Sequence, residues 1–208
     1  MNISKYLLID VGFVITAITL LFVFQGGKKK SPLFQSSNIE KLLRESSVKF
    51  PEKEKLIMLE KLSKDQGSGI KFDSLVGDWK FASVWKKDQD EEDQVFSSLL
   101  RVFYANLKIK KKISIEHFPT FPVVASIRFG FFTIEFSGTG YLRGKQPLLP
   151  FFLNLIELKS GSNILLARRL KEPADKEKPF FSLIASEDNG RWLSARGQGG
   201  SLLLWLKD

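Results

Sequence analysis

The chain has 208 residues, which at about 100 to 200 residues per domain makes one globular domain with short additions, or two small domains. A hydrophobic fraction of 43% that includes 19 Phe can build a sizeable core, so global disorder is excluded. The absence of cysteine excludes disulfides, thiolate metal sites and a cysteine nucleophile, and the single histidine, His117, disfavours a histidine-based metal site. A net charge of +9 favours an anionic partner, either a lipid surface or nucleic acid.

An apolar run near the N-terminus favours a lipid surface over nucleic acid as the anionic partner. From Tyr6 to Phe24 the only charged residue is Asp10, and a helix over this run would span about 28 Å, close to the ~30 Å hydrocarbon core of a bilayer. A cleaved signal peptide has a shorter apolar region that ends in small residues, whereas this run ends in Phe-Val-Phe. A buried core helix is the other alternative, but the run is apolar on all faces. We therefore expect residues 1–27 to form a single-pass transmembrane anchor.

The lysines that flank the run predict its orientation. Lys5 stands on the N-terminal side, while Lys28, Lys29 and Lys30 stand on the C-terminal side. Because the more basic flank of a membrane helix tends to stay in the cytoplasm, we expect the rest of the chain on the cytoplasmic side.

Residues 28–69 are expected to form a linker with short helices. Apolar residues recur at helical spacing between Ser37 and Asp65, and the Phe50-Pro51 pair suggests a break and a restart. The pattern predicts two short amphipathic helices. Their charges alternate in sign, which is typical of a solvated helix face, and a partner-binding helix is the alternative.

After Ile70 the hydrophobic period changes from 3.6 to 2, which indicates strands. The nine candidate strands are Asp78–Lys86, Leu107–Ile115, Val123–Gly130, Phe132–Tyr141, Leu153–Lys159, Asn163–Leu170, Phe180–Ser186, Arg191–Arg196 and Ser201–Lys207. The segment Phe96–Tyr104 fits either a short helix or a strand. Short joints favour an antiparallel meander, and closure into a barrel would remove its exposed edges. The predicted fold is mainly β, with an antiparallel barrel over residues 70–208.

Two strands carry further information in the phase of their side chains. In Leu107–Ile115 the three lysines Lys108, Lys110 and Lys112 share one face, and we expect this face to help dock the domain on an anionic bilayer. The alternative is that these lysines keep the strand soluble or protect an edge. Beside Gly130 the apolar phase shifts, which predicts a β-bulge that bends the strand.

One local motif opens the first predicted strand, and a second motif precedes the last one. Gly77-Asp78-Trp79 and Arg196-Gly197 would meet if the barrel closed, with Arg196 over Trp79 in a cation–π contact of about 0.5 to 2 kcal/mol. We interpret this pairing as structural. The glycine clusters at 197–200 and 138–140 are predicted to be hairpin turns, because the residues that follow a phosphate-binding loop are absent.

These motifs carry a resemblance to a known family. Two short helices, then LVGDWK at 75–80 before a β-rich region, then RGQGGSLLL at 196–204 resemble the plastid-lipid-associated protein or fibrillin family of cyanobacteria and chloroplasts. That family is similar to lipocalins, whose G-x-W signature matches Gly77 and Trp79. The resemblance covers Ile39–Asp208. The chain departs from the family in two ways: Leu193 stands where the family often has arginine, and members of the family commonly lack a membrane anchor.

The resemblance implies a location and a role. It implies a lipocalin-like β-barrel at photosynthetic membranes, here a thylakoid with the domain on the stromal side. Such a barrel binds or shields lipids, carotenoids or quinones and catalyses no reaction of its own.

Three hypotheses about function follow. The first is an anchored, non-enzymatic barrel that holds an apolar ligand. The second is a scaffold or assembly factor that brings a filled barrel to a membrane protein complex. The third is an enzyme, which is disfavoured because His117 has no catalytic partner in motif form and no paired-carboxylate signature appears. We therefore expect no catalytic residues, metal, cofactor or nucleic-acid partner. The expected partners are membrane lipid, an apolar small molecule and a membrane protein complex.

Overall fold

A computed structural model describes residues 51–87, 89–111, 120–145, 147–187 and 190–208, and we describe the compact unit Lys53–Asp208. The predicted anchor, its orientation and the first of the two predicted helices lie outside the described residues, as do Lys112 and His117. Within the described ranges, none of the helices combines the length and the apolarity needed to cross a bilayer.

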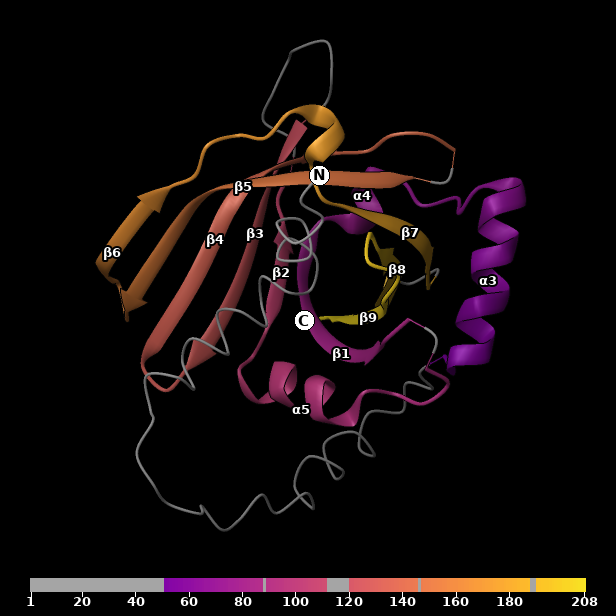
Figure 1. Cartoon of the computed structure of the whole chain (residues 1–208), viewed down its shortest axis with the longest axis horizontal. Coiled ribbons are helices and arrows are strands. Elements are labelled where there is room, and N and C mark those ends of the chain that lie inside the picture. The colour runs from indigo at the N-terminus through magenta and orange to yellow at the C-terminus, as the bar shows by residue number, and fades with distance from the viewer. Residues whose placement is uncertain (1–50, 88, 112–119, 146, 188–189) are drawn as a thin grey trace, which may run out of the picture. The chain divides into compact units, whose positions relative to one another are not determined.

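One antiparallel sheet of nine strands forms most of the structure. Its strands are β1 (Gly77–Trp85), β2 (Asn106–Ile109), β3 (Thr120–Phe129), β4 (Phe132–Tyr141), β5 (Leu148–Ser160), β6 (Asn163–Arg169), β7 (Phe180–Ser186), β8 (Trp192–Gly197) and β9 (Leu202–Lys207). In the order β4-β3-β2-β1-β9-β8-β7-β5 they close into a ring, because β4 also pairs with β5. β6 pairs with β5 and lies outside this ring (Figure 1). The predicted antiparallel barrel is therefore confirmed.

Among the described residues, three α-helices and a short 3-10 helix accompany the sheet. Helix α3 (Lys53–Gln66) matches the second predicted helix and begins after Pro51. Helix α5 (Gln94–Val102) resolves the ambiguous segment as a helix, and the Asp93 side chain caps it by accepting a hydrogen bond from the Phe96 amide. The sequence pattern did not predict α4 (Phe72–Leu75) or η2 (Asp175–Glu177), because neither is long enough to show a helical period.

The pairing register assigns each strand residue to one of two faces. Directly opposed residues share a face, so Phe81, Trp205, Leu193 and Trp79 lie together. The Trp205 ring also contacts Phe181 of β7, although β8 separates the two strands, so this face is concave and lines the barrel. Helix α3 lies against the opposite, outer face alongside β7 and β8 (Figure 1).

Short helices pack near both ends of β1. At its beginning, Trp79 Nε1 donates a hydrogen bond of 2.7 Å to the carbonyl oxygen of Leu75 in α4. Towards its end, the amide of Val84 donates a 2.9 Å bond to Ser97 Oγ of α5. Polar contacts thus fix α4 and α5 to the strand that begins the barrel.

The predicted β-bulge at Gly130 is wrong. Gly130 and Phe131 form the two-residue turn between β3 and β4, since Phe129 pairs directly with Phe132. Gly130 has φ +58, the left-handed conformation that the first residue of such a hairpin turn can require. The apolar phase shifts here because the chain reverses direction, and the strand itself does not bend at this point.

The two glycine clusters have different roles. The turn predicted at 197–200 is confirmed, with the Gly200 amide donating to the Gly197 carbonyl at 2.9 Å. The turn predicted at 138–140 is wrong, because Gly138 and Gly140 lie inside β4. A Cβ atom at Gly138 would stand 1.8 Å from the carbonyl oxygen of Phe152, so only glycine allows β5 to approach this closely.

Replacing Gly138 tests how much the closure of the barrel depends on that approach. Gly138→Ala should lower the free energy of unfolding by about 3 kcal/mol, because the atom in its way belongs to the backbone and cannot turn aside. Urea unfolding of the full chain in detergent micelles measures the change. Thr139→Ala, at an exposed neighbour in the same strand, serves as the control. Equal stability of the two variants would contradict the tight closure.

Trp79 offers a second test of the core. Its side chain is 0% exposed, so Trp79→Ala should destabilise the fold by about 3 to 5 kcal/mol. Trp79→Phe keeps most of the ring but leaves the Leu75 carbonyl without its donor, which should cost about 1 to 3 kcal/mol. The same urea unfolding measures both, with Val95→Ala at a 73% exposed position as control. A Trp79→Ala variant as stable as the control would show that this core contact is unimportant.

Candidate functional site

The predicted contact between Arg196 and Trp79 is wrong. The cation over the Trp79 ring is Lys207, whose Nζ lies 5.2 Å from the ring centroid. Arg196 pairs with Leu202 on the outer face, whereas Trp79 belongs to the inner face. Gly77 leaves room for the Lys207 side chain in this contact, since a Cβ atom at position 77 would stand 2.6 Å from Lys207 Cε. Gly197 ends β8 and begins the following turn.

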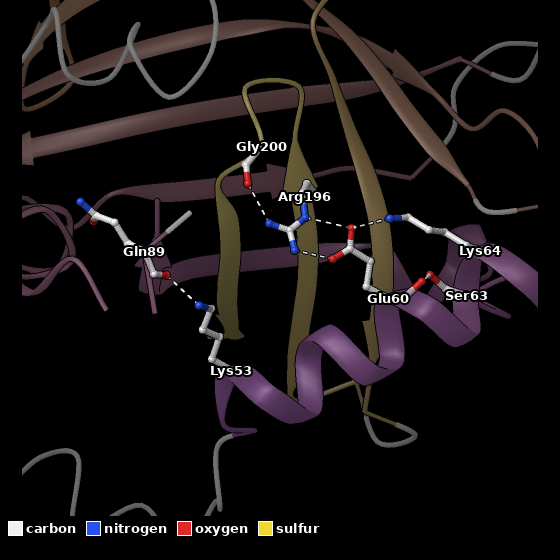
Figure 2. A network of polar contacts seen from close by, with 7 residues as sticks. All are labelled: Lys53, Glu60, Ser63, Lys64, Gln89, Arg196 and Gly200. Carbon is white, nitrogen blue, oxygen red and sulfur yellow. Dashed lines mark hydrogen bonds and ion pairs between the residues drawn. The ribbon is translucent and has the colours of Figure 1, made fainter. Parts of the chain in front are cut away.

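Arg196 instead joins helix α3 to the outside of β8 (Figure 2). Its Nε donates to Glu60 Oε1 at 2.9 Å, its Nη2 bonds Glu60 Oε2, and its Nη1 donates to the Gly200 carbonyl at 2.7 Å. Lys64 also forms an ion pair with Glu60 at 3.2 Å, and Ser63 Oγ donates to the Glu60 carbonyl. The two-pronged contact of guanidinium and carboxylate holds one defined geometry between the helix and the strand.

The environment of Glu60 keeps its carboxylate charged. Burial alone would raise the pKa of Glu60, but the hydrogen bond and charge of Arg196, with a further contribution from Lys64, lower it overall. Glu60 is therefore ionised at neutral pH and does not carry a proton for transfer. We interpret the Arg196 cluster (Lys64, Glu60, Arg196 and Gly200) as a clamp that holds α3 in place.

The lowered pKa of Glu60 makes the clamp sensitive to acid. Its contribution to stability is present above the ordinary glutamate pKa of about 4.3 and is lost as the pH falls through the lower pKa of the folded state. Glu60→Gln should cost about 3 kcal/mol at pH 7, because it leaves a partly buried Arg196 without its partner. Urea unfolding at a series of pH values should show this cost shrinking below about pH 4. Glu54→Gln, at an exposed position of α3, is the control, and a cost that does not change with pH would contradict the clamp.

Inside the barrel, aromatic rings from four strands form a continuous row. The centroid distances are 5.0 Å from Phe81 to Trp205, 5.4 Å from Trp205 to Phe181 and 5.0 Å from Phe181 to Phe151. The three phenylalanines are only half-buried although they face inward, whereas Trp205 is 0% exposed. Solvent-accessible surface therefore remains beside this aromatic row (Phe81, Trp205, Phe181 and Phe151).

The indole of Trp205 adds one polar group to the aromatic row. Its Nε1 is buried and has no hydrogen-bond partner within the described part of the chain. Leaving a buried donor unpaired costs about 1 to 3 kcal/mol, so an acceptor oxygen at this place would be bound favourably. The sequence pattern did not indicate a role for this residue, because Trp205 stands in the apolar run LLLWL, which is typical of a buried core strand. The one available hint was that an indole N–H in such a run needs an acceptor.

The inner face stays apolar where β3 and β5 end and β4 begins. Ile127 is 2% exposed, whereas Phe132, Ile134 and Leu158 on the same face are half-buried. The apolar wall thus continues from the core to the surface of the molecule.

The lysines of the predicted docking face do not behave alike. Lys108 lies on the outer face of β2 and pairs with Asp78 at 2.9 Å. Lys110 is exposed just after β2, and Lys112 lies outside the described residues. Membrane docking by this face stays a prediction, with one of its three charges already paired.

No family model, no curated protein and no solved structure matches the chain. The resemblance to the plastid-lipid-associated family therefore stays a prediction. In the described ranges no group of three or more His, Asp or Glu side chains is placed to hold a metal ion.

Proposed function

We propose that this protein is a membrane-anchored, non-enzymatic β-barrel that binds or shields an apolar ligand carrying a hydrogen-bond acceptor. The observation that carries the proposal is the aromatic row, in which two partly accessible phenylalanine rings contact the Trp205 ring, whose buried Nε1 is unpaired within the described residues. The membrane setting rests on the predicted anchor at 1–27, and the photosynthetic membrane rests on the family resemblance.

The chemistry of the row narrows the class of ligand. Flat rings suit acyl, prenyl or polyene chains, and a single donor suits one carbonyl or hydroxyl oxygen. Quinones, oxygenated carotenoids and lipid esters meet both conditions, whereas a pure hydrocarbon lacks the acceptor. Quinones and esters are the ligands we favour, since their carbonyl oxygen is a strong acceptor.

The distribution of charge supports binding without catalysis. Along the described strands of the ring, the acidic side chains alternate onto the outer face, as Asp78, Glu135 and Glu157 do. Lys207, at the end of β9, is the inward cation and lies over Trp79. Acid–base chemistry on a ligand beside Trp205 would need a titratable partner that these strands do not place there.

Removing the indole donor tests the proposal directly. Trp205→Phe keeps an aromatic ring but loses Nε1, so it should weaken binding of an alkylated benzoquinone about fivefold, the worth of a hydrogen bond of roughly 1 kcal/mol. Binding of an alkylbenzene with the same chain should change much less. Calorimetric titration of the full chain in lipid nanodiscs measures both ligands.

Trp85→Phe is the matched control, because Trp85 is also buried but belongs to the outer face of β1. It should leave both affinities unchanged. Equal effects of Trp205→Phe and Trp85→Phe, or no quinone binding to the wild-type chain, would contradict the proposal. Native mass spectrometry of the chain purified from membranes would then show which lipid or pigment, if any, accompanies it.

A scaffold for a membrane protein complex is the second candidate. Helix α3 is clamped to the barrel, yet Met58 and Leu62 on it are 64% and 48% exposed. Apolar side chains held outward on a fixed helix suit a protein partner. A purified chain that carries no ligand but co-purifies with a protein complex, and loses it in Met58→Ser with Leu62→Ser, would favour this function.

A further inference from the structure

Two hairpins, β3–β4 and β5–β6, extend beyond the ring of the barrel (Figure 1). The turn of β3 and β4 lies beside the turn of β5 and β6, since the Gly161 amide donates to the Phe131 carbonyl at 3.3 Å. We define the hairpin tip as Phe131, Ile164, Leu165 and Leu166, whose exposed fractions are 70%, 55%, 54% and 65%.

The hairpin tip does not have the features of an ordinary water-exposed edge. All seven residues of β6 are exposed, and the strand pairs with β5 along one side. Natural edge strands usually carry charges or a proline that discourage association, but in β6 the four residues after Asn163 are aliphatic. Phe131 packs on Phe132 at 4.3 Å and still keeps most of its surface uncovered. A contiguous exposed apolar surface of this kind is typical of a contact with a protein or a membrane.

The charges behind the hairpin tip show which environment suits it. Arg168 and Arg169 are exposed two and three residues behind Leu166, whereas Arg128, three residues before Phe131, lies over the Tyr104 ring at 4.6 Å. The carboxylates on the neighbouring strands, Glu135 and Glu157, both pair with Lys159 at 2.9 Å. The free charges beside the tip are therefore cationic, which favours an anionic surface.

We infer that the hairpin tip inserts shallowly into the interface of an anionic lipid bilayer. At about 3.3 Å per residue, Arg168 and Arg169 lie roughly 7 to 10 Å behind Leu166 and about 13 to 17 Å behind Ile164. With β6 inclined to the bilayer, the apolar side chains of the tip stay within the ~5 to 10 Å to which such side chains enter the headgroup boundary. The arginines then reach the lipid phosphates. Insertion stays shallow, because the edge of β6 that has no partner strand among the described residues carries backbone groups that need water or headgroups.

This inference goes beyond the proposed function, since the tip can insert whether or not the interior holds a ligand. It also differs from docking through the lysines of β2. Strand β3 connects the two surfaces, because the amide of Lys110 donates a hydrogen bond to the carbonyl of Pro122 in this strand. The strand ends beside the tip at Phe129, seven residues after Pro122. The two surfaces are therefore about 23 Å apart along β3, far enough for a depth measurement to tell them apart.

The absence of cysteine from the chain allows a single reporter to be placed at each surface. Phe131→Cys and Lys110→Cys would each be labelled with an environment-sensitive fluorophore in the full chain, reconstituted into vesicles of phosphatidylcholine with phosphatidylglycerol. Nitroxide-labelled lipids then report contact with the acyl region. We expect loss of fluorescence at position 131 and little loss at position 110.

Replacing the arginines tests the charge argument. Arg168→Gln with Arg169→Gln should lower the in–out equilibrium constant of the tip about 25-fold, at roughly 1 kcal/mol for each basic residue near an anionic surface. Arg143→Gln with Lys145→Gln, which removes two exposed charges from the turn between β4 and β5, should leave quenching at position 131 unchanged.

Three results would overturn the inference. A water-exposed fluorophore at position 131 would show a free tip, and one shielded from water but not quenched by lipid would assign the tip to a protein contact. Quenching that is equal in neutral and anionic vesicles and unaffected by the arginine changes would show that charge plays no part. Quinone binding that persists in any of these cases would leave the proposed function intact.

Discussion

β5 pairs with three strands, and both the barrel and the projecting hairpins depend on how its length is divided. Its first residues, Leu148–Pro150, pair with β7 and complete the ring, while Leu155–Ser160 pair with β6 along the same edge. The other edge pairs with β4 over most of the strand, and Gly138 permits the closest approach there. One strand therefore closes a barrel at one end and extends an open sheet at the other.

This division gives the two parts of the domain different physical properties. In the closed part, helices α4 and α5 are bonded to β1, and Trp79 and Trp205 are fully buried. In the open part, the inner face keeps half-buried aliphatic residues such as Ile134 and ends in an exposed turn at Phe131. A rigid ring can hold an aromatic row in register, while the open strands extend an apolar surface away from it. The proposed insertion of the hairpin tip uses this extended apolar surface.

Local patterns were enough to predict most of the strands but not their tertiary contacts. Strands β4 and β7 match the predicted bounds, because alternation of apolar and polar residues is a property of each segment alone. β5 begins five residues before its predicted start, since Pro150 and the continuous run LLPFFL hide the alternation. Arg196 was given the wrong partner, because Glu60 lies 136 residues away and no local signal links the two. Whether Nε1 of Trp205 finds a hydrogen-bond partner depends on neighbours from other strands, so the sequence alone could not predict that it is unpaired.

The pairing of β1 with β9 has a consequence for how the chain folds. Trp79 of β1 pairs with Lys207 of β9, so during synthesis this pairing can form only after 128 further residues have been made. At about 5 to 20 residues per second, this wait lasts roughly 6 to 25 seconds. Throughout it, the apolar side of β1 with Trp79 and Phe81 lacks its final cover, while the β3–β4 hairpin can form as soon as its own residues emerge. The nascent chain is thus prone to wrong association through β1, and the synthesis of β9 ends this exposure.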